Sequence, residues 1–173
     1  MIKQVAKLML KNKDVELTHF SELNKKFDVL FQANHEFIGR VLKCHLIIEK
    51  YLNDCLEFFY GKDSIESANL RFYQKLVLLK NTAPSMKMAF IGVQEINQIR
   101  NRFAHKLNTR ITISDVKSCK PLVDTFLGES VRDPARIIEV FTSIVCVWLA
   151  DDISDIGTKR KRQIAKLVAK KVK

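Results

Sequence analysis

A long stretch of helical periodicity over residues 33–60 constrains the fold of this chain more than any other feature. Apolar residues, with one histidine among them, recur there every three or four positions, the spacing that places side chains on one face of an α-helix. This stripe consists of Ile38, Val41, Leu42, His45, Ile48, Leu52, Cys55, Leu56 and Phe59. The pattern predicts one long amphipathic helix that stops at Gly61.

Two more amphipathic helices follow in the sequence. The spacing of apolar residues predicts a single helix over 64–80 and, after a break at 81–84, another from Ser85 to about Leu107. Residues 108–113 are polar and β-branched and predict a loop or a short extended piece.

The C-terminal half carries two helix starts of different quality. Ser114 is followed at its third position by Lys117 rather than by an acid, so it is an incomplete N-cap for a short helix reaching Leu127. Asp133 is a better N-cap, because proline occupies the first helical position after it. The helix that begins there is apolar almost all round, so we expect it to lie centrally and to end at Gly157.

The composition agrees with a helical domain. The chain has 173 residues, 47% of them apolar, with only 5 glycines and 3 prolines. We therefore predict an all-α protein, a compact helical bundle of about five main helices. Residues 1–157 form its single domain, with residues 1–32 as a helical extension, and residues 158–173 form a basic tail.

Neither a secreted nor a membrane protein is expected from this sequence. The first ten residues lack a signal-peptide pattern, and the most apolar run, 144–150, is too short to span a bilayer. The four cysteines have no metal-ligand spacing, so we expect buried, reduced thiols, no metal and no cofactor. These features favour a soluble, cytoplasmic protein.

The positive charge lies at the two ends of the chain. Residues 158–173 contain eight lysines and arginines and no acid, and residues 1–13 contain four lysines and no acid. Since the whole chain has a formal charge of +11, residues 14–157 sum to −1.

The basic tail has apolar residues at helical spacing beneath its cationic face. This pattern fits contact with nucleic-acid phosphates, an acidic membrane surface or a solvated helix. It has no aromatic residues to stack on bases. Among these alternatives we expect contact with nucleic-acid phosphates, through the run Lys159, Arg160, Lys161 and Arg162.

The heptapeptide IRNRFAH (99–105) is the candidate site. Arginine offers a permanent planar charge for phosphate, and histidine titrates near neutrality for acid–base work. On an ideal helix Arg100 and His105 project about 140° apart. The histidine must therefore lie at a helix end or an unwound turn, or a second copy must complete the site. The alternative is structural, with His105 capping a helix and Arg100 solvated.

These residues resemble the HEPN superfamily. Arg100, Asn101 and His105 match its R-x4–6-H motif, and "IRNRFAH" followed by "ITISD" (111–115) resembles the mannitol-repressor-like branch. "GRVLKCHLIIEKYLNDCL" (39–56) and "NLRFYQKLVLL" (69–79) resemble the first two long helices of that branch. The resemblance covers roughly residues 35–155.

The resemblance implies a homodimeric helical bundle and, in many members, a metal-independent endoribonuclease acting in defence, in stress response or as a toxin. Arg100 would stabilise the charged transition state, and His105 would act as general acid or base on the 2′-hydroxyl or the leaving oxygen. Asn101 would orient the histidine or the phosphate. Arg102 would be a second phosphate contact or solvated.

Other members of the superfamily are not enzymes. The alternative function is therefore a non-catalytic, mannitol-repressor-like transcriptional regulator, or a module that binds a protein partner such as an antitoxin. Glu49 could brace the motif arginine, but an ordinary boundary glutamate is preferred. His45, on the apolar stripe, is interpreted as a satisfied core histidine.

Deleting residues 158–173 should lower RNA affinity and leave the fold intact. The deletion reduces the formal charge from +11 to +3. Because each phosphate contact releases counterions, the salt dependence of binding should also fall. Binding isotherms at several salt concentrations measure both effects. An unchanged salt slope would show that the tail does not contact phosphate.

Overall fold

A computed structural model describes residues 35–106 and 109–154, together with Ser21, Lys25 and Gly157. By its internal contacts the chain divides into residues 1–35 and 36–173, and the helix packing of the bundle lies within the second unit. The expected N-terminal extension and basic tail, including residues 159–162, lie outside the described residues, apart from Ser21 and Lys25.

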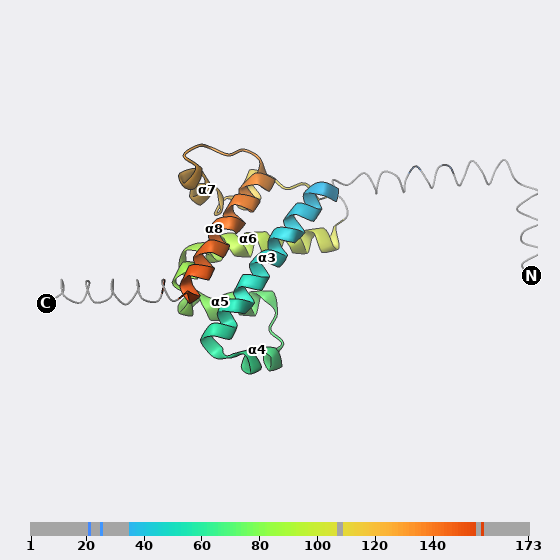
Figure 1. Cartoon of the computed structure of the whole chain (residues 1–173). Helices are drawn as coiled ribbons and strands as arrows, with labels where there is room; N and C mark the ends of the chain where they lie inside the picture. The colour runs from blue at the N-terminus through green and yellow to red at the C-terminus, as the bar shows by residue number, and fades with distance from the viewer. Residues whose placement is uncertain (1–20, 22–24, 26–34, 107–108, 155–156, 158–173) are drawn as a thin grey trace, which may run out of the picture. The chain divides into compact units, whose positions relative to one another are not determined.

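All regular secondary structure of the described residues is helical (Figure 1). Its elements are α3 (His35–Tyr60), α4 (Lys62–Ala68), α5 (Phe72–Thr82), α6 (Pro84–His105), the 3-10 helix η1 (Ile113–Val116), α7 (Lys120–Leu127) and α8 (Pro134–Ile153). No strand occurs in the part of the chain that is described. The prediction of an all-α bundle is confirmed, with six α-helices in the described ranges where about five were expected.

Two helix ends lie where their sequence signals predicted them. α3 stops before Gly61, whose φ of 85° is a conformation that glycine adopts without strain. α8 starts after Asp133, whose carboxylate accepts hydrogen bonds from the backbone N–H groups of Ala135 (3.1 Å) and Arg136 (3.3 Å). These bonds satisfy donors that the first turn of a helix leaves without a partner.

The prediction of one helix over 64–80 is wrong. Asn69 adopts the left-handed conformation (φ 44°, ψ 51°) and separates α4 from α5. The new helix is capped when the backbone N–H of Arg71 donates to the side-chain oxygen of Gln74 at 2.8 Å. Asparagine tolerates the left-handed region better than most residues. The break therefore has a local cause, the backbone conformation of one residue, which the spacing of apolar residues does not indicate.

Two further boundaries differ from the prediction. Thr112, not Ser114, is the N-cap, and it starts η1 rather than α7: its backbone N–H donates to Asp115 at 2.8 Å. α8 ends at Ile153, before Gly157, because the backbone of Ser154 turns to an extended conformation.

α3, α6 and α8 enclose most of the core (Figure 1). α3 and α8 run in the same direction, since Arg40 pairs with Glu139 near their starts and the Cys55 thiol donates to the carbonyl of Leu149 near their ends. The Arg40–Glu139 pair has two bonds, of 2.7 and 2.8 Å. The expectation that α8 lies centrally is met, because eleven of its twenty residues are buried.

Helix α6 approaches α8 closely at one glycine. A Cβ atom added to Gly92 would lie 2.4 Å from Cζ of Phe141, so the aromatic ring packs directly on the backbone of α6. Phe141 is buried, and the residues around it form the continuous core. The contact sets the distance between the helix that carries the IRNRFAH motif and the most buried helix of the domain.

None of the described helices combines the length and the apolar character needed to cross a membrane. Cys44, Cys55, Cys119 and Cys146 are free thiols and all are buried, as expected. Burial raises the pKa of the Cys146 thiol to about 12, and it also raises the pKa of the Cys44 and Cys119 thiols. Such thiols are poor nucleophiles near neutral pH.

Gly92→Ala should destabilise the fold by about 1–3 kcal/mol, the usual cost of forcing an extra carbon into a packed core. Urea unfolding measures the change. Gly39→Ala is the matched control, because a Cβ atom there meets nothing within 4 Å and alanine favours a helix interior. The control should be neutral or slightly stabilising, and equal effects of the two substitutions would contradict the proposed packing.

Candidate functional site

The IRNRFAH motif forms the last two turns of α6. Ile99 is fully buried and anchors this part of the helix, whereas Arg100 and Asn101 are exposed. His105 is the last residue of α6 and is also exposed. His105 therefore lies at a helix end, one of the alternatives that the sequence left open.

Arg100 and His105 do not converge within one chain. Because α6 stays helical as far as His105, the two side chains leave the helix about 140° apart. The Arg100 guanidinium donates to the side-chain oxygen of Asn101 at 3.3 Å. Within residues 35–106 and 109–154, the His105 side chain makes no hydrogen bond or ion pair. Both motif side chains remain accessible to a ligand or to another chain.

A buried histidine lies beneath the Arg100 side of α6. His45, on α3, stacks on the ring of Phe72 with 4.2 Å between the ring centroids. Its Nε2 lies 3.1 Å from the side-chain oxygen of Asn97, so the protonated nitrogen donates to that oxygen. The interpretation of His45 as a satisfied core histidine is confirmed.

The pKa of His45 is lowered from 6.5. Burial is the main cause, and the positive charges of Arg100 and Lys75 act in the same direction. The hydrogen bond with Asn97 and the negative charge of Glu49 oppose the shift. His45 is therefore held neutral near pH 7 in the interior, between α3 and α6.

Glu49 does not pair with the motif arginine. Its carboxylate accepts a bond of 2.7 Å from the ammonium group of Lys75, which links α3 to α5. Both side chains are partly buried, which strengthens the pair relative to one on the open surface. Glu49 is thus a boundary residue that joins two helices.

Arg102 has a partner that its sequence pattern does not reveal. Its guanidinium forms an ion pair of 2.8 Å with Asp115, at the end of η1. Burial alone would raise the pKa of Asp115, but hydrogen bonds from Thr112 and the charge of Arg102 hold that pKa below its usual value. Arg102 is therefore tied to η1.

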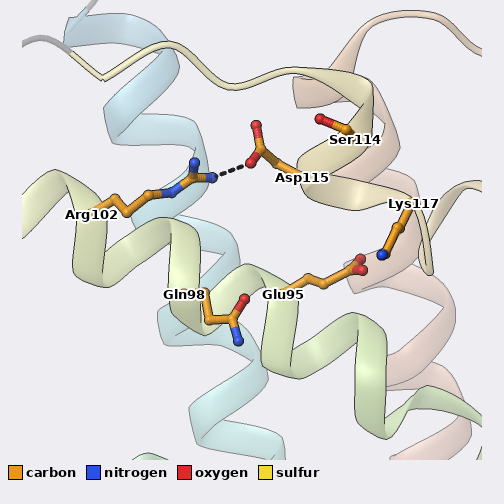
Figure 2. A pocket seen from close by; sticks show the side chains of 6 residues that line it. All are labelled: Glu95, Gln98, Arg102, Ser114, Asp115 and Lys117. Carbon is orange, nitrogen blue, oxygen red and sulfur yellow. Dashed lines mark ion pairs between the residues drawn. The ribbon is translucent and has the colours of Figure 1, made fainter.

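Arg102 and Asp115 line a cavity between α6 and η1 (Figure 2). The cavity has a volume of about 330 Å³. One wall consists of the α6 residues Glu95, Gln98 and Arg102, and the other of Ser114, Asp115 and Lys117. All six lining residues are polar or charged.

Glu95 holds the second wall of the cavity in place. This buried carboxylate accepts hydrogen bonds from the backbone N–H of Ser118 at 3.0 Å and from its hydroxyl at 2.7 Å. A buried carboxylate needs such donors to offset the loss of hydration. Glu95 therefore fixes the segment after η1 to the middle of α6.

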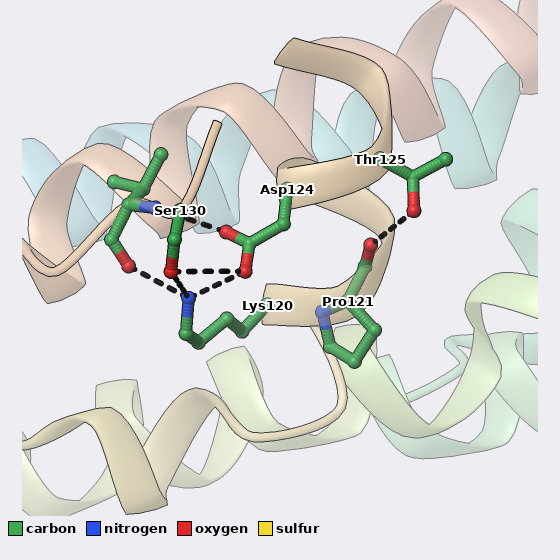
Figure 3. Close-up of polar contacts among 6 residues, drawn as sticks. Lys120, Pro121, Asp124, Thr125 and Ser130 are labelled. Atoms are coloured by element: carbon green, nitrogen blue, oxygen red, sulfur yellow. Dashed lines mark hydrogen bonds and ion pairs between the residues drawn. The ribbon is translucent and has the colours of Figure 1, made fainter. Parts of the chain in front are cut away.

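A polar cluster fixes the chain that follows this wall (Figure 3). The ammonium group of Lys120 donates to Asp124 at 2.5 Å, to the Ser130 hydroxyl at 2.9 Å and to the carbonyl of Val131 at 3.0 Å. The bond from Lys120 is the main cause that lowers the pKa of Asp124. This cluster closes the connection between α7 and α8.

No group of three or more metal-ligating side chains occurs among the residues that are described. Searches against family models, curated proteins and solved structures gave no match to this chain.

Lowering the pH should destabilise the protein through His45. The pKa of His45 is lower in the folded protein than in the unfolded chain, whose histidine has the ordinary value of 6.5. Below pH 6.5 the unfolded chain therefore binds more protons, and the free energy of unfolding decreases as the pH falls. Above pH 6.5 His45 is neutral in both states, and its full contribution to stability is present. Urea unfolding at pH 7.5 and 5.5 should give a smaller pH-dependent change for His45→Gln than for wild type. The difference cannot exceed about 1.4 kcal/mol per pH unit for one proton.

If the pH-dependent change in the free energy of unfolding of His45→Gln equalled that of wild type, the lowered pKa of His45 would be disproved.

Proposed function

We propose that this chain is a HEPN-like, metal-independent endoribonuclease that acts as a homodimer through Arg100, Asn101 and His105. One observation carries the proposal: the arginine and the histidine of the motif are both exposed at the end of a well-anchored helix, and no internal ion pair engages them among the described residues. An arginine and a histidine held ready on a rigid element suit phosphate chemistry.

The chemistry requires no metal. The 2′-oxygen attacks the adjacent phosphorus while a histidine removes its proton, and the 5′-oxygen leaves with a proton from a histidine. The products are a 2′,3′-cyclic phosphate and a free 5′-hydroxyl. The guanidinium of Arg100 stabilises the negative charge that develops on the phosphate oxygens. Asn101 orients Arg100 through their 3.3 Å hydrogen bond.

A second copy supplies the missing half of the site. Since Arg100 and His105 of one copy diverge, the arginine of one protomer acts with the histidine of its partner in the proposed dimer. A twofold axis near the end of α6 brings the same surface of each copy together.

Exposed apolar side chains on α3 and α5 suit such an interface. Leu42 and Leu46 lie on either side of His45 along α3, and Leu46 is 65% exposed. On α5, Tyr73 follows the Phe72 ring that His45 stacks on, and it is half exposed. Covering these side chains stabilises association of two copies.

The basic tail adds affinity for the substrate. Lys159, Arg160, Lys161 and Arg162 are proposed to contact RNA phosphates. Arg102 has its charge paired with Asp115, so we place it with the cavity rather than with the scissile phosphate.

Purified protein should cleave single-stranded RNA in EDTA and leave 2′,3′-cyclic phosphate ends. His105→Ala should lower the rate by about 10²–10⁴-fold, the contribution of a positioned acid or base. Arg100→Ala should lose a comparable amount through charge stabilisation. RNA with a 2′-deoxy substitution at the cut site should resist. Gel electrophoresis of end-labelled RNA measures all of these.

Arg110→Ala is the matched control, because it removes the same charge from an exposed position outside the motif. Its cleavage rate should stay close to that of wild type. If wild type and His105→Ala cleave equally, His105 is not the catalytic group. If neither cleaves RNA while both dimerise, the chain is a non-catalytic regulator or protein-binding module instead.

A mixing experiment tests whether the site is shared between copies. Arg100→Ala and His105→Ala protomers are each inactive in the proposal, but a mixed dimer contains one intact arginine and one intact histidine on different chains. Co-refolded mixtures should therefore recover part of the activity. Recovery in no mixture, despite formation of mixed dimers, would place both residues of each site on one chain.

A further inference from the structure

The cavity between α6 and η1 has the polarity of a base-binding site rather than of a phosphate site. Its lining carries two carboxylates, Glu95 and Asp115, and two cations, Arg102 and Lys117, so its formal charges cancel. A phosphate would gain no net attraction there. A neutral ligand with many hydrogen-bonding groups fits the charge pattern, and the volume of about 330 Å³ is at the small end of ligand sites.

Some of the side chains that line the cavity already have partners within the protein, and others are available to a ligand. Arg102 and Asp115 hold each other at 2.8 Å, and Glu95 receives two donors from Ser118. In contrast, Gln98 and Lys117 are exposed, and no hydrogen bond or ion pair engages either side chain within the described ranges. A carboxylate has about four acceptor positions, so Asp115 also retains acceptor capacity beside its bonds to Arg102 and Thr112.

The cavity lies on the His105 side of α6. Gln98, Arg102 and His105 follow at intervals of four and three residues, which places them along one face of the helix. Figure 2 shows Arg102 extending from α6 toward Asp115 of η1; Gln98, four residues earlier on α6, also lines the cavity. A nucleotide whose base occupies the cavity can extend its ribose and phosphate along this face to the histidine one turn further on.

We propose that this cavity is a base-binding subsite that selects guanine next to the bond that is cut, an inference that rests on the ribonuclease activity proposed above. Guanine alone among the RNA bases offers two adjacent donors, N1–H and the N2 amino group, for the remaining acceptor position of Asp115 and the amide oxygen of Gln98, together with O6 and N7 as acceptors for a cation. Lysine and arginine are the usual partners of O6 and N7. The side chains of Asp115, Lys117 and Gln98 supply both kinds of partner.

The other bases fit this lining less well. Adenine places its N1 lone pair beside its amino group, so a carboxylate that accepts from one is repelled by the other. Uracil offers one donor between two carbonyl oxygens. Arg102, held by Asp115, adds a planar guanidinium on which an unpaired base can stack, as single-stranded RNA bases do on arginine.

Titration calorimetry with GMP, AMP, CMP and UMP tests the subsite in the full chain. The four nucleotides share the phosphate, so their differences report the base alone. GMP should bind at least about tenfold more tightly than the others, the discrimination that one good base contact provides. Lys117→Ala and Gln98→Ala should each remove most of this preference, whereas Lys87→Ala, an exposed lysine on α6 outside the cavity, should not.

Two outcomes would overturn the subsite: equal affinity for the four nucleotides, or a GMP preference that survives both Lys117→Ala and Gln98→Ala. A nucleoside monophosphate has no phosphodiester bond to cleave, so this experiment is independent of catalysis. GMP selectivity without RNA cleavage would remove the proposed enzyme but keep the guanine site. RNA cleavage without GMP selectivity would remove the guanine site but keep the proposed enzyme.

Discussion

The contact between Gly92 and Phe141 determines where helix α6 can lie. The aromatic ring occupies the space that any side chain at position 92 would need, so α6 and α8 meet backbone to ring. A close-packed interior leaves little freedom to shift such a contact. Because α5 also packs on α6, and α3 pairs with α8 through Arg40 and Glu139, the remaining helices take their places around this junction.

Two buried carboxylates then fix α6 along its length. Asp152, on α8, accepts the backbone N–H of Ser85 at 3.0 Å, at the first turn of α6. Glu95, in its middle, accepts from Ser118. Each acid accepts hydrogen bonds from neutral donors, which help to offset the loss of hydration on burial. The start of α6 is thus held to α8, and its centre is held to the segment after η1. These contacts, which lie outside the IRNRFAH motif, determine the direction of the helix that carries it.

Local signals account for the part of the fold that could be predicted. The stripe of α3, its end at Gly61 and the Asp133 cap of α8 each depend on residues close together in sequence. The break at Asn69 was missed because the apolar spacing begins directly after it, at Leu70, Tyr73 and Val77, and nothing in that spacing separates it from the helix-forming residues before Asn69. Periodicity reports which face is apolar, but it does not report a single residue that turns to the left-handed conformation.

The candidate site was predictable only in part, for a similar reason. The exposure of Arg100 and the terminal position of His105 follow from the stripe of α6, which is local. The pairing of Arg102 with Asp115 joins residues on different elements, and helical spacing says nothing about which charges meet across them. Glu95 carries no sequence signal of its role, because Ser118, whose hydroxyl it accepts, lies 23 residues away on another segment.

The two faces of α6 divide the proposed reaction between two copies. Arg100 lies on the side of α3 and α5, where its charge helps to lower the pKa of His45. His105 lies on the side of η1, one turn beyond Arg102 and the cavity. Consider a dimer that pairs Arg100 of one chain with His105 of the other. The chain that supplies His105 for proton transfer then also binds the RNA base in its cavity. Its partner then contributes charge to the phosphate, so association of the copies completes the chemistry and base selection stays within one chain.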